Sequence, residues 1–276
     1  MSGRTAWRRR RWGLFAIGLG AAAACAEIGT GPNDAAAIEM EPFPSPSVVI
    51  GDTLRNINGV VAPVRAIVRN VRGDVIDDAP IRYLYAEFNR DSALRVDSAT
   101  GIVVALRASS GADPRVAARV GGSLQVLRAL VVTQRPDTVI AQPSPALLTT
   151  VFPDTGRFQA TSNATQALSV GIRTRTNDAL ANVNAWPVRF ELVAPANPTN
   201  DTNAVAFLVD DSGRPSTLDT SDVGGTAGRR VRVRAQRFPT GAAVETVIVR
   251  AVITYKGQPV AGSPLLLTGT VRRGTP

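Results

Sequence analysis

Short runs of β-branched and other apolar residues, separated by glycine, asparagine, aspartate and proline, fill the chain from about residue 46 onward. In one run Val64, Ala66 and Val68 alternate with Arg65, and this period of two is typical of a half-buried strand. No stretch of about 12 residues in this region holds a 3.6-residue period, which argues against helices. Many short strands at a spacing of roughly ten residues predict an all-β protein, either a sandwich or a barrel.

The predicted strands form two groups along the chain. They lie at residues 64–68, 75–76, 81–85, 94–97, 102–106, 115–120 and 124–132 in the first group and at 167–176, 187–193, 204–209, 229–235, 245–255 and 264–271 in the second. Three prolines mark residues 134–146 as a linker, although residues 138–140 could instead begin the second group. We therefore expect two domains, at residues 46–134 and 135–276, preceded by a flexible tether at residues 25–45.

A positively charged segment and a largely apolar segment precede the only cysteine, Cys25. Four arginines at residues 8–11 are followed by about 13 residues, too few to span a hydrocarbon core that needs about 20. This order resembles the signal of a bacterial lipoprotein, with residues 1–24 as signal peptide and Ala22, Ala23 and Ala24 as the lipobox. The resemblance implies that Cys25 is lipidated and anchors an exported protein to the outer membrane or cell surface.

Ala22 departs from the lipobox pattern, which usually has leucine at that position. The alternative is ordinary cleavage after Ala24 or Ala26, which would give a secreted protein. Removal of residues 1–24 takes away five arginines and no acid, so the formal charge falls from +9 to about +4. This weaker basicity argues against a nucleic-acid partner. Because there is no second cysteine, no internal disulfide can form and the core must hold by burial.

The first strand group contains three motifs with glycine. Gly73 precedes the strand around Tyr83, Gly101 lies in the hairpin of VDSATGIVVAL, and GG at residues 121–122 precedes the last strand. These motifs resemble a bacterial immunoglobulin-like domain of group 2, in which tryptophan stands where this chain has Tyr83. The resemblance implies an immunoglobulin-like β-sandwich with Tyr83 as an aromatic core residue whose hydroxyl needs a partner. Gly101 lies where the hairpin needs a residue that tolerates positive φ.

The second strand group is similar, more loosely, to invasin-type immunoglobulin-like domains. PVRF at residues 187–190 follows a turn, and DDSG at residues 210–213 forms a loop before a later strand. Together the two resemblances imply two tandem immunoglobulin-like β-sandwiches after the lipoprotein signal and tether.

Arg230, Arg232 and Arg234 alternate with aliphatic residues in a predicted strand, which places their guanidinium groups on one face of a sheet. We expect this face to be solvated; the alternative is an anion-binding stripe for surface polysaccharide, lipid headgroups or another polyanion, since guanidinium suits phosphate and carboxylate. Aromatic residues do not interleave with the arginines as in a single-strand nucleic-acid platform.

Histidine is absent, and the chain has no nucleophile elbow, phosphate-binding loop or paired-cysteine metal site. We therefore expect no catalytic residues, metal or cofactor. The expected function is a non-catalytic envelope lipoprotein that displays immunoglobulin-like domains for adhesion or another surface interaction with polysaccharide or envelope proteins. Two alternatives are a structural spacer or assembly subunit of the envelope and a carbohydrate- or polyanion-binding module.

Overall fold

The computed structural model describes residues 34–87, 92–109, 111–143, 147–150, 164–176, 179–196, 204–234 and 244–273. The predicted signal peptide, the lipobox and Cys25 lie outside the described residues. The described part consists of strands and their connections, so it includes no helix long and apolar enough to cross a membrane. The expectation of an all-β protein is confirmed.

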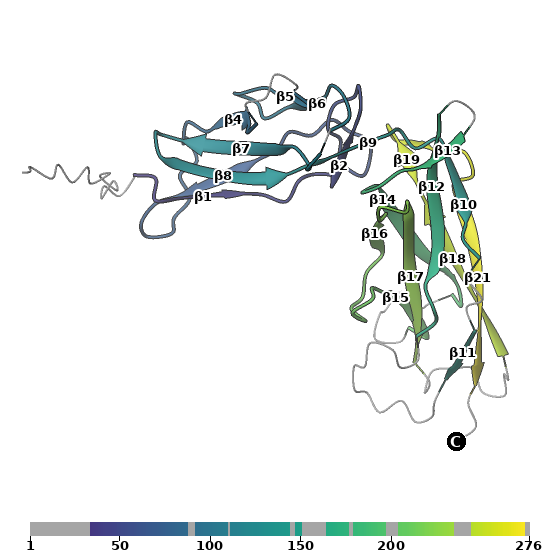
Figure 1. Cartoon of the computed structure of the whole chain (residues 1–276). Coiled ribbons are helices and arrows are strands. Elements are labelled where there is room, and N and C mark those ends of the chain that lie inside the picture. The colour runs from purple at the N-terminus through teal and green to yellow at the C-terminus, as the bar shows by residue number, and fades with distance from the viewer. Residues whose placement is uncertain are drawn as a thin grey trace, which may run out of the picture.

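The first group of strands in the structure lies between residues 37 and 133, and we call it the N-terminal half (Figure 1). β4, β7 and β8 form one antiparallel sheet, β1 pairs with β3, β5 pairs with β6, and β2 runs parallel to β9. The bounds are β1 (Ala37–Met40), β2 (Ser47–Val49), β3 (Ala66–Arg69), β4 (Arg82–Tyr85), β5 (Leu94–Val96), β6 (Val103–Ala105), β7 (Arg115–Val120), β8 (Leu124–Ala129) and β9 (Val131–Thr133).

The remaining strands, which we call the C-terminal half, form two main sheets in the orders β10-β12-β17-β15 and β11-β21-β18-β14-β16, and β19 pairs with β20. Their bounds are β10 (Thr138–Ala141), β11 (Leu147–Thr150), β12 (Leu168–Thr176), β13 (Ala179–Asn182), β14 (Pro187–Ala194), β15 (Ala206–Val209), β16 (Leu218–Thr220), β17 (Thr226–Val233), β18 (Val244–Val252), β19 (Thr254–Tyr255), β20 (Gln258–Pro259) and β21 (Leu265–Arg273). An edge strand that runs parallel to the last strand, as β11 does to β21, and this division of strands between two sheets are typical of an immunoglobulin-like sandwich.

Alternating side chains supply the core of each half. In β14, Val188 and Phe190 are fully buried while Arg189 between them is exposed, as the period of two requires. Val247, Val249 and Ala251 of β18 show the same alternation in the same sheet. The buried apolar residues form two clusters, one within residues 40–130 and one that spans residues 139–271 and also includes Val49 of β2.

Tyr83 occupies the core of the N-terminal half, as the sequence predicts. Its side chain is buried, and its hydroxyl accepts a hydrogen bond of 3.1 Å from the backbone N–H of Ala66. Gly101 packs against the Tyr83 ring and has a φ of 72°. A Cβ at Gly101 would meet both that ring and the carbonyl oxygen of Val64, so glycine is required there for space as well as for backbone conformation.

Part of the segment expected to be a flexible tether is folded. β1 pairs with β3 in antiparallel register, and Met40 is buried in the N-terminal core. The composition of residues 26–45 does not reveal this strand, because β1 has only four residues. Its extended conformation is stabilised by pairing with β3 and by burial of one of its faces. The expectation of a solvated tether is therefore wrong for residues 37–40.

Four hairpin loops share one pattern, an asparagine or aspartate followed three residues later by glycine. The side-chain oxygens of Asn56, Asn70, Asp210 and Asp222 each accept a hydrogen bond of 2.8–3.1 Å from the backbone N–H four residues on. The glycine of each loop donates its N–H to the carbonyl oxygen of the same residue and has a φ between 69° and 87°. The side chain thus closes the turn, and glycine supplies the left-handed conformation.

Substitution of Gly73 by alanine tests this turn chemistry. Gly73 has a φ of 87° and nothing within 4 Å of an added Cβ, so Gly73→Ala changes backbone strain alone. We expect a loss of about 1 kcal/mol in the free energy of unfolding, measured by urea titration. Gly122→Ala is the matched control, because Gly122 is also an open turn glycine but has no positive φ, and it should have no such effect. Equal losses in the two variants would contradict the account.

Candidate functional site

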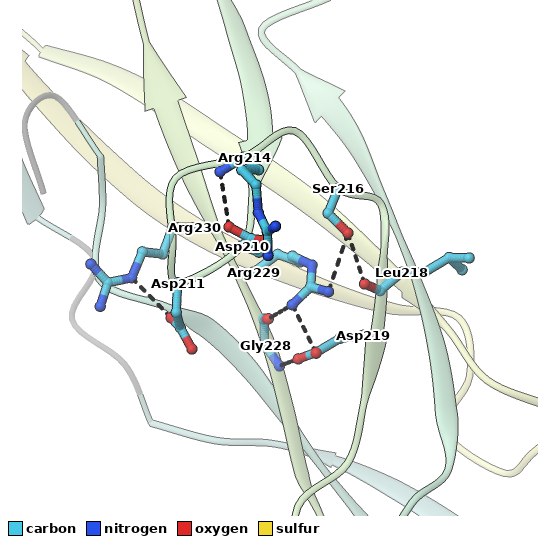
Figure 2. A network of polar contacts seen from close by, with 9 residues as sticks. All are labelled: Asp210, Asp211, Arg214, Ser216, Leu218, Asp219, Gly228, Arg229 and Arg230. Atoms are coloured by element: carbon cyan, nitrogen blue, oxygen red, sulfur yellow. Dashed lines mark hydrogen bonds and ion pairs between the residues drawn. The ribbon is translucent and has the colours of Figure 1, made fainter. Parts of the chain in front are cut away.

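An arginine network joins the two main sheets of the C-terminal half (Figure 2). Arg229 of β17 points inward, is largely buried, and forms an ion pair of 2.8 Å with Asp219 of β16. Asp219 also accepts the backbone N–H of Gly228 at 2.7 Å, while Arg229 donates to the hydroxyl of Ser216 at 3.3 Å. Since β16 is the edge strand of one sheet and β17 is an inner strand of the other, this pair ties the two sheets together.

The structure places the three arginines of the predicted stripe in different environments. Arg230 forms an ion pair of 3.3 Å with Asp211 (Figure 2), and Arg234 lies over the ring of Phe207 at 5.2 Å. Arg232 is only 5% exposed, and its backbone forms a β-bridge with Ala164. The expectation of a fully solvated arginine face is thus wrong for Arg232, and anion binding by these three residues stays a prediction.

A second candidate lies where the two halves meet, and we call it the junction pocket. The pocket has a volume of about 250 Å³. Three segments that are far apart in the sequence form its walls: residues 45–59, residues 186–191 at the beginning of β14, and residues 252–257 around β19. In Figure 1 these segments come together where β2 and β9 approach β14 and β19. The pocket therefore exists only because the two halves are in contact.

Asp52 is the central charged residue of the junction pocket, and its side chain is 10% exposed. Arg55 donates two hydrogen bonds of 3.1 Å each to this carboxylate, from Nε to Oδ2 and from Nη2 to Oδ1. The hydroxyl of Tyr255, from the other half, donates to Oδ2 at 2.9 Å, and Lys256 Nζ lies 3.5 Å from the same oxygen. The backbone N–H of Thr53 donates to Oδ1 at 2.8 Å, so both oxygens are fully engaged.

These contacts determine the protonation states in the pocket. Burial alone would raise the pKa of Asp52, but the hydrogen bonds from Arg55, Thr53 and Tyr255 outweigh it and lower that pKa to about 2. Burial and the adjacent Asp52 carboxylate raise the pKa of Tyr255 to about 12. At neutral pH the pair is therefore a carboxylate and a neutral phenol that donates to it.

Further hydrogen bonds and close packing fix the junction. Ser47 Oγ donates to the carbonyl oxygen of Ala185 at 2.7 Å, and Thr133 Oγ1 donates to Asn184 Oδ1 at 3.0 Å. The loop around Gly59 packs on the β19–β20 hairpin so closely that a Cβ on Gly59 would overlap the backbone of Gly257. Both sides of the pocket are thereby held in one arrangement.

Sequence reasoning did not single out the junction residues. Asp52 follows a glycine and looks like an ordinary turn residue, and its main partner from the other half, Tyr255, is 203 positions away. One usable signal was present: Arg55 follows Asp52 at a spacing that permits a local ion pair. Arg229 was likewise overlooked. The alternation of the strand places its side chain on the buried face, where a charge requires a partner.

Comparisons with known proteins give no family assignment. No protein-family model matches the sequence, and no curated protein matches it. Solved structures are similar over most of the chain. The crystal structure of the S-layer protein SbsC domains 4 and 5 matches 87% of this chain and 97% of that one, with 8% identity and a TM-score of 0.27.

Two cadherin structures give similar values. The Protocadherin GammaB4 extracellular domain matches 83% of this chain at 16% identity and a TM-score of 0.23, and Drosophila N-cadherin EC1-4 matches 87% at 12% identity and a TM-score of 0.25. This chain spans 30% of the protocadherin structure and 50% of the N-cadherin structure. At these scores the superpositions are partial, so the immunoglobulin-like assignment stands on the strand order described above.

Substitution of Asp219 tests the link between the two sheets. Asp219→Ala leaves the buried guanidinium of Arg229 without its counter-ion, so we expect the free energy of unfolding to fall by about 2–3 kcal/mol. Asp211→Ala is the control, because Asp211 also pairs with an arginine but its side chain is 90% exposed; it should cost less than about 1 kcal/mol. Chemical denaturation would measure both variants, and similar losses would contradict a special role for Asp219.

Stability should depend on pH through Asp52. Because the pKa of its folded form lies below the ordinary 3.8, the stabilisation is complete above about pH 4 and disappears as the pH falls through about 2. Asp52→Asn should therefore lower the free energy of unfolding by about 2 kcal/mol at pH 7, and the difference from the parent chain should shrink toward pH 2. Asp78→Asn, which removes a carboxylate at an exposed turn, is the control and should leave the free energy of unfolding at pH 7 nearly unchanged. A pH-independent loss in Asp52→Asn would contradict this linkage.

Proposed function

We propose that this protein is an exported, non-catalytic component of a bacterial cell envelope, anchored by a lipid on Cys25, that displays immunoglobulin-like domains for surface interaction. The observation that carries the proposal is the order of arginines, apolar segment and sole cysteine ahead of an all-β fold. A thiol in that position is a substrate for acylation. The rest of the chain contains no cysteine with which it could pair.

The chemistry of the described acids supports a non-catalytic role. Asp52, the most enclosed acid of the junction pocket, is held ionised by its partners, and a pKa of about 2 is far from the neutral range that suits a general acid or base. No group of three or more potential metal ligands occurs among the described residues. The whole chain also lacks histidine.

The N-terminal half supports the finer assignment to the group 2 type of bacterial immunoglobulin-like domain. Tyr83 fills the core position that tryptophan has in that family, and Gly101 contacts its ring in the hairpin between β5 and β6. Surface interaction would use loops at the ends of the sheets or exposed sheet edges, which are the usual binding regions of such folds.

A spacer of the envelope is the second candidate function, and the junction favours it. Hydrogen bonds between the halves, including those of Ser47, Thr133 and Tyr255, would keep their spacing and orientation fixed. A rigid connection of this kind suits a protein that holds a partner at a set distance from a membrane.

Lipidation can be tested directly with the full chain. Expressed in a Gram-negative bacterium that is fed labelled palmitate, the chain should incorporate the label, and Cys25→Ser should abolish incorporation because the acylated thiol is lost. Mass spectrometry should find a mature chain that begins at Cys25 and carries acyl groups.

Two further results make this test sharper. Ala22→Leu should increase the labelled fraction, because it restores the residue that lipoboxes usually contain. A mature chain that begins after Cys25 and carries no lipid would contradict the anchor and leave a secreted protein.

A further inference from the structure

Both carboxylates of the junction pocket already have cationic partners. Both oxygens of Asp52 are taken by Thr53, Arg55, Tyr255 and Lys256. Glu191, the other acid of the wall, is bound by Arg250, whose Nε donates to Glu191 Oε2 at 2.9 Å. A ligand would therefore find few free anionic groups in this pocket.

Hydrogen-bond donors remain available. The exposed Arg189 lines the pocket, and its side chain makes no hydrogen bond or ion pair within the described part of the chain, so its five guanidinium N–H donors are free there. Asn56 and Asn58 also line the pocket, and their side-chain amide nitrogens donate no hydrogen bond within the described part of the chain. The unpartnered guanidinium of Arg189 favours a ligand that carries a hydrogen-bond acceptor with a negative charge.

The charges of the lining residues also favour an anionic ligand. Three cations, Arg55, Arg189 and Lys256, face two acids, Asp52 and Glu191, and Arg250 lies against one of those acids. The local field is therefore positive, which favours an anion. A planar guanidinium that is otherwise free, as in Arg189, binds a carboxylate through two parallel hydrogen bonds.

Aromatic side chains form the apolar part of the pocket. The rings of Trp186 and Tyr255 lie 6.1 Å apart between centroids at an angle of 58°, and Ile57 and Val252 extend the apolar wall. The volume of about 250 Å³ is slightly below the usual range for ligand sites, so it suits a ligand no larger than a single ring with its substituents. An apolar wall beside convergent polar groups is typical of a small-molecule site.

We infer that the junction pocket binds a hexuronic acid, that is, a sugar ring that carries a carboxylate. Arg189 holds the carboxylate, the amides of Asn56 and Asn58 donate to ring hydroxyls, and one face of the ring packs on the apolar wall. Asp52 does not touch the sugar; it is a positioning residue that orders Arg55, Tyr255 and Lys256. This site is separate from the arginines of β17 and does not depend on lipidation of Cys25.

Trp186 offers a direct readout of binding. The chain has three tryptophans, at positions 7, 12 and 186, so the double variant Trp7→Phe/Trp12→Phe has Trp186 as its sole tryptophan. In the full-length double variant in detergent, glucuronic acid should change the Trp186 fluorescence with a Kd of about 1 mM, as expected for so small a ligand. Glucose, which lacks the carboxylate, and acetate, which lacks the ring, should each bind at least about 10-fold more weakly.

Substitutions in the same background then locate the site. Arg189→Gln should weaken glucuronic acid binding about 10-fold or more through loss of the charge-assisted contacts. Arg175→Gln is the matched control, because Arg175 is also an exposed strand arginine but lies outside the pocket lining, and it should leave the Kd unchanged.

Three results would overturn the inference: no response to glucuronic acid up to about 20 mM, binding that is unaffected by Arg189→Gln, or acetate binding as tight as that of the sugar acid. The labelling of Cys25 by palmitate is a separate measurement, so failure of the sugar site leaves the proposed anchor unaffected.

Discussion

Burial of one face of each sheet is the interaction on which the rest of this structure depends. The chain has a single cysteine, so no internal disulfide can hold it, and the strands are short. The longer strands contribute alternate apolar residues, such as Val188 and Phe190 of β14, to a core from which water is excluded. The turns must therefore set the strand register correctly, because a slip of one residue would move every one of these side chains to the solvent face.

A charged side chain that is buried loses its hydration, which costs free energy. At two places in this molecule an ion pair offsets that cost. Arg229 is buried against Asp219, and Asp52 is buried against Arg55 and Tyr255. In both cases one charged side chain is almost fully enclosed and forms an ion pair with a residue of opposite charge. Such pairs contribute little net stability compared with apolar packing, but they restrict which segments can meet. The ion pair of Asp219 favours the contact between β16 and β17, and the hydrogen bonds of Asp52 favour the contact between the two halves.

Local signals predicted much of the fold. Alternation around Val68 and Tyr83 located β3 and β4, and the Asx-x-x-Gly turns are stabilised by side-chain contacts within five residues of sequence. The strands that were missed, including β1, β2 and β16, have only three or four residues, too few to show a clear period. Their conformation comes from hydrogen bonds to partner strands, which a single segment does not encode. Arg232 was predicted to be solvated for a related reason: the period of two assigns a face but does not say what covers that face.

The sequence by itself determined that the chain is all-β, where its turns lie, that no disulfide can support it, and which segment resembles an export signal, because each of these depends on residues that are neighbours in the chain. Only the tertiary structure decided which charges are buried and where a pocket exists. Asp52 and Tyr255 are 203 positions apart and share a hydrogen bond of 2.9 Å. The environment of a charged group is set by whatever packs around it, and for this pair those groups come from opposite halves of the molecule.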